Sequence, residues 1–379
     1  MDLKNIFSSS TDKKVRYGIV ALGDITQEAM LPGITQTYNS EVTAFVTGDD
    51  EKAQALGKMY NVTHMYHYDE FQTLLKSDQI DALYIATPNW RHAEFAVPAL
   101  EAGIHVLLEK PMEISAEKCQ LILDAQAKSK AKLMIAYRLH FEPSTLSLVK
   151  DIRAGKLGEL RYFSACFSQM IDPDNHRAKE GDLAGPLYDM GTYPINAARY
   201  VFDDEPIEVI SASSIRYVDS NLENSPDTVV ATLRFPKDRI AQFIVSYSTS
   251  SINSFVVGGT KGVIEMKPAF TYGKPMAQYR NIQGEESQET FNATDQFAGE
   301  VEYFSECILC QRQPEPNGTE GLADVRIIEA IVTACEQNKS VKLEPVPGLR
   351  RIDVEGQLKK IKYKKPPEPV NTKSPVEKN

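Results

Sequence analysis

The stretch VRYGIVALGDIT at residues 15–26 opens with an apolar run typical of a buried strand, and a helical pattern begins at its end. The turn between them follows the glycine spacing of dinucleotide-binding folds, but only the middle glycine, Gly23, is present. Ala21 can replace the first glycine provided that the turn avoids positive φ. Asp24 must point away from a bound phosphate, because a carboxylate repels it. A plain strand–helix turn is the alternative. Four residues are expected at a pyrophosphate: Leu22, Gly23, Asp24 and Ile25.

Strands and helices alternate from this turn to about residue 137. Apolar runs at 41–47, 64–66, 81–86, 104–108 and 132–136 are separated by helical patterns. Runs that are apolar without alternation fit strands covered on both faces, which is typical of a parallel sheet wound with helices. We therefore predict a doubly wound α/β domain at residues 15–137, preceded by an arm at residues 1–14.

The pattern changes after about residue 155. Segments rich in β-branched and aromatic residues follow at 159–169, 207–218, 227–235, 239–249, 253–259 and 262–267. Turn signals separate them, which predicts a large, mostly antiparallel sheet. Helical stretches at 187–202, 295–312 and 320–338 complete an α+β domain at residues 138–345. Residues 346–379 are basic and rich in proline, and we expect a mobile tail.

Composition narrows the function classes. The 379 residues carry a formal net charge of −10, which argues against a nucleic-acid partner. Their apolar runs are too short to span a membrane, and no secretory signal is visible. Five scattered cysteines indicate a reducing compartment, so we expect a cytoplasmic protein. Cys307 and Cys310 lie within a helical run, and the six histidines show no metal-binding spacing, so no metal is expected.

Two polar clusters follow strands of the first domain. Thr87-Pro88-Asn89 precedes His92 after the strand at 81–86, and Glu109-Lys110-Pro111 follows the strand at 104–108. Ligands of open α/β sheets bind beyond the carboxyl ends of the strands, so both clusters are well placed for a site. The ammonium of Lys110 can stabilise charge that develops on a substrate oxygen. A helix start for the first cluster and a surface lysine for the second are the alternatives.

A third cluster lies in the second domain, where Asp189 and Tyr193 are four residues apart and would share one helix face. A carboxylate and a phenol beside a lysine form a workable proton-transfer set.

The tip of the strand at 41–47 indicates which dinucleotide binds. Thr47 and Gly48 replace the acid that NAD-specific folds place there, and Lys52 follows, which favours NADP. Asp49-Asp50-Glu51 either approach the cofactor or begin a helix.

These motifs together resemble the Gfo/Idh/MocA oxidoreductases, in particular the branch of glucose–fructose oxidoreductase. The match runs from about residue 15 to 343 and includes Tyr137-Arg138-x-His140 and Ser246-Tyr247-Ser248-Thr249. The resemblance implies a Rossmann domain that binds NADP, with NAD possible, and an open-sheet domain whose exposed face forms a homodimer or homotetramer. His176 stands where close relatives place a tryptophan.

The resemblance also implies roles for individual residues. Lys110, Asp189 and Tyr193 would surround the reacting carbon of a sugar, with Tyr193 as the proton carrier. Arg138 and Arg177 would flank the cofactor or the sugar, and His176 would contact the sugar. The implied activity is an NADP-dependent sugar dehydrogenase or sugar–sugar oxidoreductase. An NAD-dependent glycosidase and a non-catalytic dinucleotide-binding regulator are the alternatives.

Overall fold

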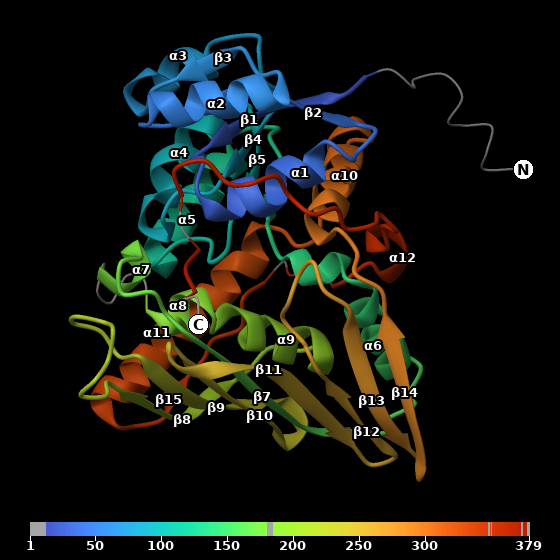
Figure 1. Ribbon diagram of the computed structural model, residues 1–379. Coiled ribbons are helices and arrows are strands. Elements are labelled where there is room, and N and C mark those ends of the chain that lie inside the picture. Colours follow the sequence, from blue (N-terminus) through green and yellow to red (C-terminus); the bar gives the residue numbers. More distant parts are fainter. Residues whose placement is uncertain (1–12, 180–184, 348, 350, 373, 377–379) are drawn as a thin grey trace, which may run out of the picture.

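The computed structural model describes residues 13–179, 185–347, 349, 351–372 and 374–376. They form two sheets with their covering helices, one built by the N-terminal third of the chain and one by the rest (Figure 1). The predicted arm at residues 1–14 lies outside the described residues except for Lys13 and Lys14. No helix in the described part of the chain is long and apolar enough to cross a membrane.

The first sheet has six strands in the order β3-β2-β1-β4-β5-β6, and every pair of neighbours is parallel. This order is that of a Rossmann fold, and it reverses between β1 and β4. The predicted doubly wound sheet is therefore confirmed. The strands are β1 Val15–Val20, β2 Ser40–Val46, β3 His64–Tyr66, β4 Ala82–Ile85, β5 His105–Leu108 and β6 Leu133–Ile135.

Helices cover both faces of this sheet. One face packs against α3 Phe71–Leu75, α4 His92–Glu101 and α5 Ala116–Ala127. The other packs against α1 Leu31–Ile34, α2 Asp50–Tyr60 and α10 Gln296–Leu309. Helix α10 comes late in the chain, yet Phe297, Val301 and Phe304 are buried in the core of the first domain. The two domains therefore share core packing.

The second sheet has nine strands in the order β14-β13-β12-β11-β7-β10-β9-β8-β15, and all neighbours are antiparallel except β7 and β10. Helices α6 Pro143–Arg153, α9 Thr192–Phe202 and α11 Gly318–Gln337 bury its inner face. The strands are β7 Leu160–Met170, β8 Glu208–Ile215, β9 Thr228–Phe235, β10 Arg239–Ser246, β11 Ser248–Gly259, β12 Gly262–Met266, β13 Met276–Ile282, β14 Glu285–Phe291 and β15 Val341–Lys342.

Several elements differ from the sequence prediction. Strands β13 and β14 and helix α6 were not predicted; β14 (EESQETF) is an exposed edge strand without an apolar face. The helix predicted at 187–202 is two helices, α8 Pro186–Asp189 and α9, broken at Met190 and Gly191. A side chain at position 191 would lie 2.3 Å from the Leu187 carbonyl oxygen, so glycine is required at this close turn.

The C-terminal segment at 346–379 is packed against both domains in its described part, whereas a mobile extension was predicted. Short helix α12 Val354–Gln357 places the Gln357 side chain, fully buried, against the carbonyl oxygen of Glu315 at 3.0 Å. Further along, the Val370 amide donates to the Gln27 side chain at 2.7 Å. Composition suggested a solvated tail, but the segment finds backbone partners that composition does not reveal.

Candidate active site

The turn after β1 lies at the carboxyl edge of the first sheet, where the strand order reverses. Ala21 has a φ of 74°, so the condition under which alanine replaces the first glycine without strain is not met. The hydroxyl of Thr26 donates to the Ala21 carbonyl oxygen at 2.9 Å and closes the turn. A side chain at Gly23 would meet nothing within 4 Å, so the backbone here is open to a ligand.

Asp24 begins the helix that follows this turn. One oxygen of its carboxyl group is shielded from solvent and has no hydrogen-bond partner in the described structure. Burial raises the pKa of Asp24 to about 6, Glu28 acts in the same direction, and Arg177 opposes the change. The predicted acid therefore does lie at the cofactor turn, in a setting that disfavours its charge.

His92 connects the loops at 87–89 and 109–111 from the interior of the first domain. Its buried ring lies with Nδ1 3.0 Å from the Pro111 carbonyl oxygen and Nε2 3.0 Å from the Thr87 carbonyl oxygen. Burial lowers the pKa of His92 to about 4, so the ring is neutral at pH 7. We conclude that His92 positions the two loops from the interior. The Thr87 hydroxyl, also buried, has no partner among the described residues.

Lys110 and Asp189 meet across the two domains. The Lys110 ammonium donates to the Asp189 carbonyl oxygen at 2.8 Å and to its carboxylate at 3.2 Å. The other carboxylate oxygen accepts a 2.5 Å bond from the Tyr247 hydroxyl and lies 3.5 Å from Nε of Arg177. Burial acts to raise the pKa of Asp189, but Lys110 and Arg177 outweigh it and hold that pKa well below its ordinary value. Asp189 is therefore ionised.

Tyr193 lies beside this ion pair, on the next helix. Its ring centroid is 4.6 Å from the Lys110 nitrogen, and its hydroxyl is 3.3 Å from Nε of Arg138. The prediction that Asp189 and Tyr193 share one helix face is wrong, because the chain breaks between α8 and α9. The two side chains still meet at Lys110. Burial acts to lower the pKa of Lys110, but Tyr193 and Asp189 outweigh it and raise that pKa, so the lysine is charged.

Arg138 and Glu109 lie behind the tyrosine and the lysine. The Arg138 guanidinium is fixed by the Phe270 carbonyl oxygen at 2.7 Å and by the Gln296 side chain. Glu109 accepts from the Tyr84 hydroxyl at 2.7 Å and from the Lys110 backbone amide at 3.1 Å. Both therefore orient their neighbours. Helix α7 His176–Lys179 carries Arg177 to Asp189, whereas the side chain of His176 lies outside the described structure.

The tip of β2 places Thr47 and Gly48 at the same edge. Asp49 caps α2, since its carboxylate accepts from the Lys52 amide at 2.9 Å, which confirms the helix-start interpretation of the acidic run. The Lys52 ammonium lies 3.5 Å from Asp49. Sequence reasoning missed Tyr68, whose ring lies 5.0 Å from the Arg91 guanidinium and faces Gly48. It also gave no role to Tyr247, although the quoted Ser-Tyr-Ser-Thr motif contains it.

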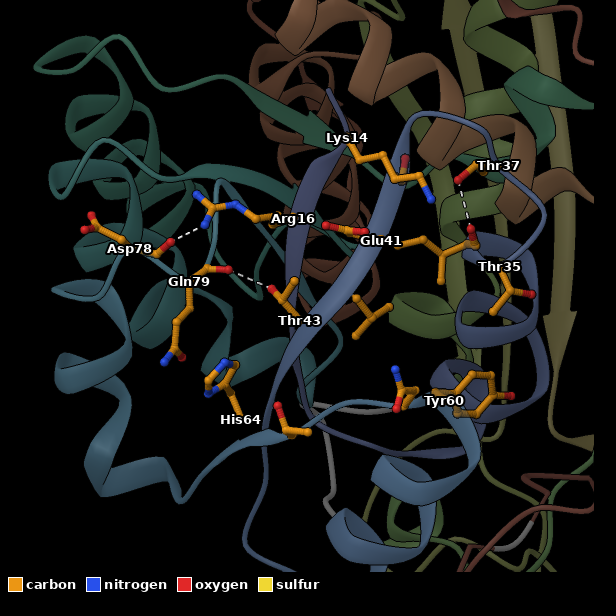
Figure 2. A pocket seen from close by; sticks show the side chains of 15 residues that line it. Lys14, Arg16, Thr35, Thr37, Glu41, Thr43, Tyr60, His64, Asp78 and Gln79 are labelled. Carbon is orange, nitrogen blue, oxygen red and sulfur yellow. Dashed lines mark hydrogen bonds between the residues drawn. The ribbon is translucent and has the colours of Figure 1, made fainter. Parts of the chain in front are cut away.

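A cavity of about 540 Å³ lies at the opposite edge of the first sheet (Figure 2). Lys14, Arg16, Glu41 and Thr43 line it from the beginnings of β1 and β2. Some of its polar groups bond to one another: the Arg16 guanidinium donates to the Asp78 carbonyl oxygen, and the Thr43 hydroxyl donates to the Gln79 carbonyl oxygen at 2.8 Å. It contains none of the predicted site residues, so size alone does not locate the site.

Comparison with known proteins agrees with this geometry. Residues 15–137 match the oxidoreductase family with an NAD-binding Rossmann fold, and residues 146–265 match the Gfo/Idh/MocA C-terminal domain. The chain is 31% identical over 345 residues to a D-xylose 1-dehydrogenase (NADP⁺) from Haloarcula marismortui, covering 89% of this chain and 95% of that one.

Two solved structures have the same architecture. An aldose-aldose oxidoreductase from Caulobacter crescentus, complexed with glycerol, is 32% identical with a TM-score of 0.82, covering 87% of this chain and all of that one. A 3-ketoreductase from Actinomadura kijaniata, in complex with NADP and TDP-benzene, is 25% identical with a TM-score of 0.77, covering 85% and 98%.

Fold and comparisons together define a two-domain oxidoreductase in which a Rossmann domain precedes an open-sheet domain. The chain belongs to the Gfo/Idh/MocA oxidoreductase family. The resemblance inferred from the motifs is thereby confirmed.

Proposed function

We propose that the chain is an NADP-dependent dehydrogenase or oxidoreductase of aldose sugars. The observation that carries this proposal is the meeting of Lys110, Asp189 and Tyr193 at the carboxyl edge of the Rossmann sheet. That edge is where dinucleotides bind in this fold. Two of the similar proteins are a D-xylose 1-dehydrogenase and an aldose-aldose oxidoreductase, which supports the substrate class.

The residues present fit a dinucleotide. Gly23 leaves the backbone open, and the Thr87 hydroxyl is a buried polar group without a partner among the described residues. A bound nicotinamide dinucleotide would supply the acceptor for the hydride of the sugar carbon that is oxidised. Leu22 and Ile25 flank the pyrophosphate turn, while Pro88 and Asn89 begin the short helical turn Asn89–Arg91 beyond β4.

The protein's own groups handle the proton. Tyr193 acts as a base in its phenolate form: it accepts the proton of the sugar hydroxyl that becomes the carbonyl and is thereby converted to the neutral phenol. The Arg138 guanidinium beside its oxygen stabilises the phenolate before the proton is transferred. Lys110 adds positive charge over the ring, and Asp189 holds Lys110 in place. Tyr247 and Arg177 in turn fix the carboxylate of Asp189.

A sugar panel tests the activity. Purified protein, NADP⁺ and each of several aldoses are mixed, and absorbance at 340 nm is followed. Growth of reduced cofactor with at least one aldose is expected. A glycosidase would instead cleave a glycoside without net change at 340 nm, and a regulator would bind cofactor without turnover.

NADP rather than NAD is favoured by the tip of β2. Thr47 is a neutral donor there, and Asp49 is already engaged at the start of α2. A charge-assisted bond from Lys52 to the 2′-phosphate contributes about 1.5–3 kcal/mol. Because Lys52 must leave Asp49 to make it, Lys52→Ala should weaken NADP⁺ by about tenfold and leave NAD⁺ nearly unchanged. Calorimetric titration of both cofactors tests this, and tighter NAD⁺ binding by the native protein would contradict it.

A homodimer or homotetramer through the outer face of the second sheet is also part of the proposal. On this face Tyr162, Val230 and Ile244 alternate with the buried residues of β7, β9 and β10 and are partly exposed. Such an apolar face on central strands favours a covering partner. Ile244→Asp should give a monomer in light scattering. Leu121→Asp, which puts the same charge on an exposed apolar residue of α5 in the first domain, is the matched control. The free state of all five cysteines supports a cytoplasmic location.

A further inference from the structure

The carboxyl group of Asp24 lies at the cofactor turn, and it forms no ion pair with a basic side chain of the described residues. It follows Gly23, at the first residue of the helix whose amino end faces the expected pyrophosphate. One of its oxygens is shielded and has no hydrogen-bond partner among the described residues. This oxygen is therefore neither in contact with solvent nor hydrogen-bonded within the described structure.

The charged and titratable side chains around Asp24 lie on three segments of the chain. Glu28 lies on the same helical segment and Arg177 on α7, while Tyr272 lies between β12 and β13. Arg177 is already paired with Asp189 at 3.5 Å, so its positive charge is shared between two carboxylates. A pyrophosphate adds further negative charge at this turn. Among the described residues around Asp24, the single positive charge of Arg177, which is shared with Asp189, therefore faces the negative charges of Asp24, Glu28 and the phosphates.

We propose that Asp24 takes up a proton when the dinucleotide binds, so that cofactor binding at this site is linked to pH. The inference rests on the proposed cofactor site. A neutral carboxylic acid removes the repulsion from the phosphates and becomes a hydrogen-bond donor to a phosphate oxygen. In the protein without dinucleotide, a pKa of about 6 leaves the carboxyl group of Asp24 mostly ionised at pH 7.5. The carboxyl group must therefore acquire a proton when the dinucleotide binds.

The linkage predicts how the dissociation constant of NADP⁺ changes with pH. Above pH 6, the dissociation constant of the native protein should rise by up to about tenfold per pH unit. Asp24→Asn is neutral at every pH, so it should bind NADP⁺ more tightly than the native protein at pH 8, by up to about 100-fold. At pH 5.5 the two proteins should bind nearly alike.

Isothermal titration calorimetry of NADP⁺ at pH 7.5, in buffers of different ionisation enthalpy, measures the protons taken up on binding. The 2′-phosphate of NADP⁺ titrates near the same pH, so the quantity of interest is the difference between native and Asp24→Asn proteins. We expect the native protein to take up as much as about one proton more. Glu28→Gln is the matched control: it keeps the extra uptake but moves its midpoint to lower pH, because Glu28 raises the pKa of Asp24.

The outcomes separate the two levels of the proposal. Equal proton uptake by native and Asp24→Asn proteins, or weaker binding by Asp24→Asn at pH 8, would overturn the role of Asp24 while the cofactor site stands. Absence of dinucleotide binding by both proteins at every pH would overturn the cofactor site itself and the linkage with it.

Discussion

Two clusters of charge in the interior of the molecule differ in how completely their groups are paired. In the first, the Arg199 guanidinium meets the carboxylates of Glu205, Glu320 and Asp324, each at 2.7 Å. In the second, which is the cluster proposed to be catalytic, Lys110 and Arg177 share Asp189. Around the catalytic cluster, in the described structure, lie buried oxygens without partners, on Asp24, Thr87 and Glu300.

This difference separates a structural cluster from a working one. A saturated network has no position left for a ligand and resists change, because removing one member leaves a buried charge uncompensated. Unpartnered polar atoms cost stability and are retained where a ligand completes them. Glu300 on α10 illustrates the cost, since burial raises its pKa well above its ordinary value and so disfavours the charged form. Mutations should therefore act on turnover in one cluster and on unfolding in the other.

Lys110→Met should have the largest effect on turnover. The ammonium is the charge nearest the Tyr193 ring, so its removal should lower turnover by about 10²–10⁴-fold. Steady-state rates at 340 nm measure this. The midpoint of urea unfolding, measured on the same protein, should change little. A large decrease in that midpoint would show that Lys110 mainly stabilises the fold.

Arg199→Met should have the largest effect on stability. It leaves the buried carboxylates of Glu320 and Asp324 without their cation, and breaking such a pair costs about 3–5 kcal/mol. Urea denaturation followed by circular dichroism measures the loss. The protein that remains folded at low temperature should retain near-native turnover. A stable variant that has lost activity would contradict the division between the two clusters.

The pair of His140 and Glu315, next to Arg199, adds a pH dependence. Burial acts to lower the pKa of His140, but Glu315, 3.0 Å away, outweighs it and raises that pKa above 6.5. Because the folded-state pKa is raised, the stabilisation is fully present below pH 6.5 and is lost as pH rises through the higher value. The stability difference between native and Glu315→Gln proteins should therefore shrink from pH 6 to 9. A difference that grows with pH would contradict this sign.

Ala21→Gly should have the smallest effect, and it tests the strain at the catalytic edge. A positive φ costs alanine about 1–2 kcal/mol, and the greater chain entropy of glycine returns about 0.5–1 kcal/mol of that. A net gain of about 0.5–1 kcal/mol in the free energy of unfolding is expected from these terms. Ala29→Gly in the following helical segment is the control and should be destabilising.

Local patterns predicted more of the first domain than of the site. Apolar runs gave the six parallel strands, and the Thr-Pro-Asn and Glu-Lys-Pro clusters lie at the predicted strand ends. The contact of Arg138 with Tyr193 and that of Tyr247 with Asp189 join residues 55 and 58 positions apart, and no short motif encodes them. Helix α10 likewise carries no mark that it packs on the first sheet. Long-range packing decides these features.

The measurement that tests the central claim most directly is Tyr193→Phe under single-turnover conditions, with NADP⁺ binding measured on the same preparation. The substitution removes one hydroxyl, the group held 3.3 Å from Arg138. Hydride transfer from the identified sugar should slow by about 10²–10⁴-fold while the dissociation constant of NADP⁺ stays within about twofold. Transfer at the native rate would show that Tyr193 does not carry the proton and would contradict the account.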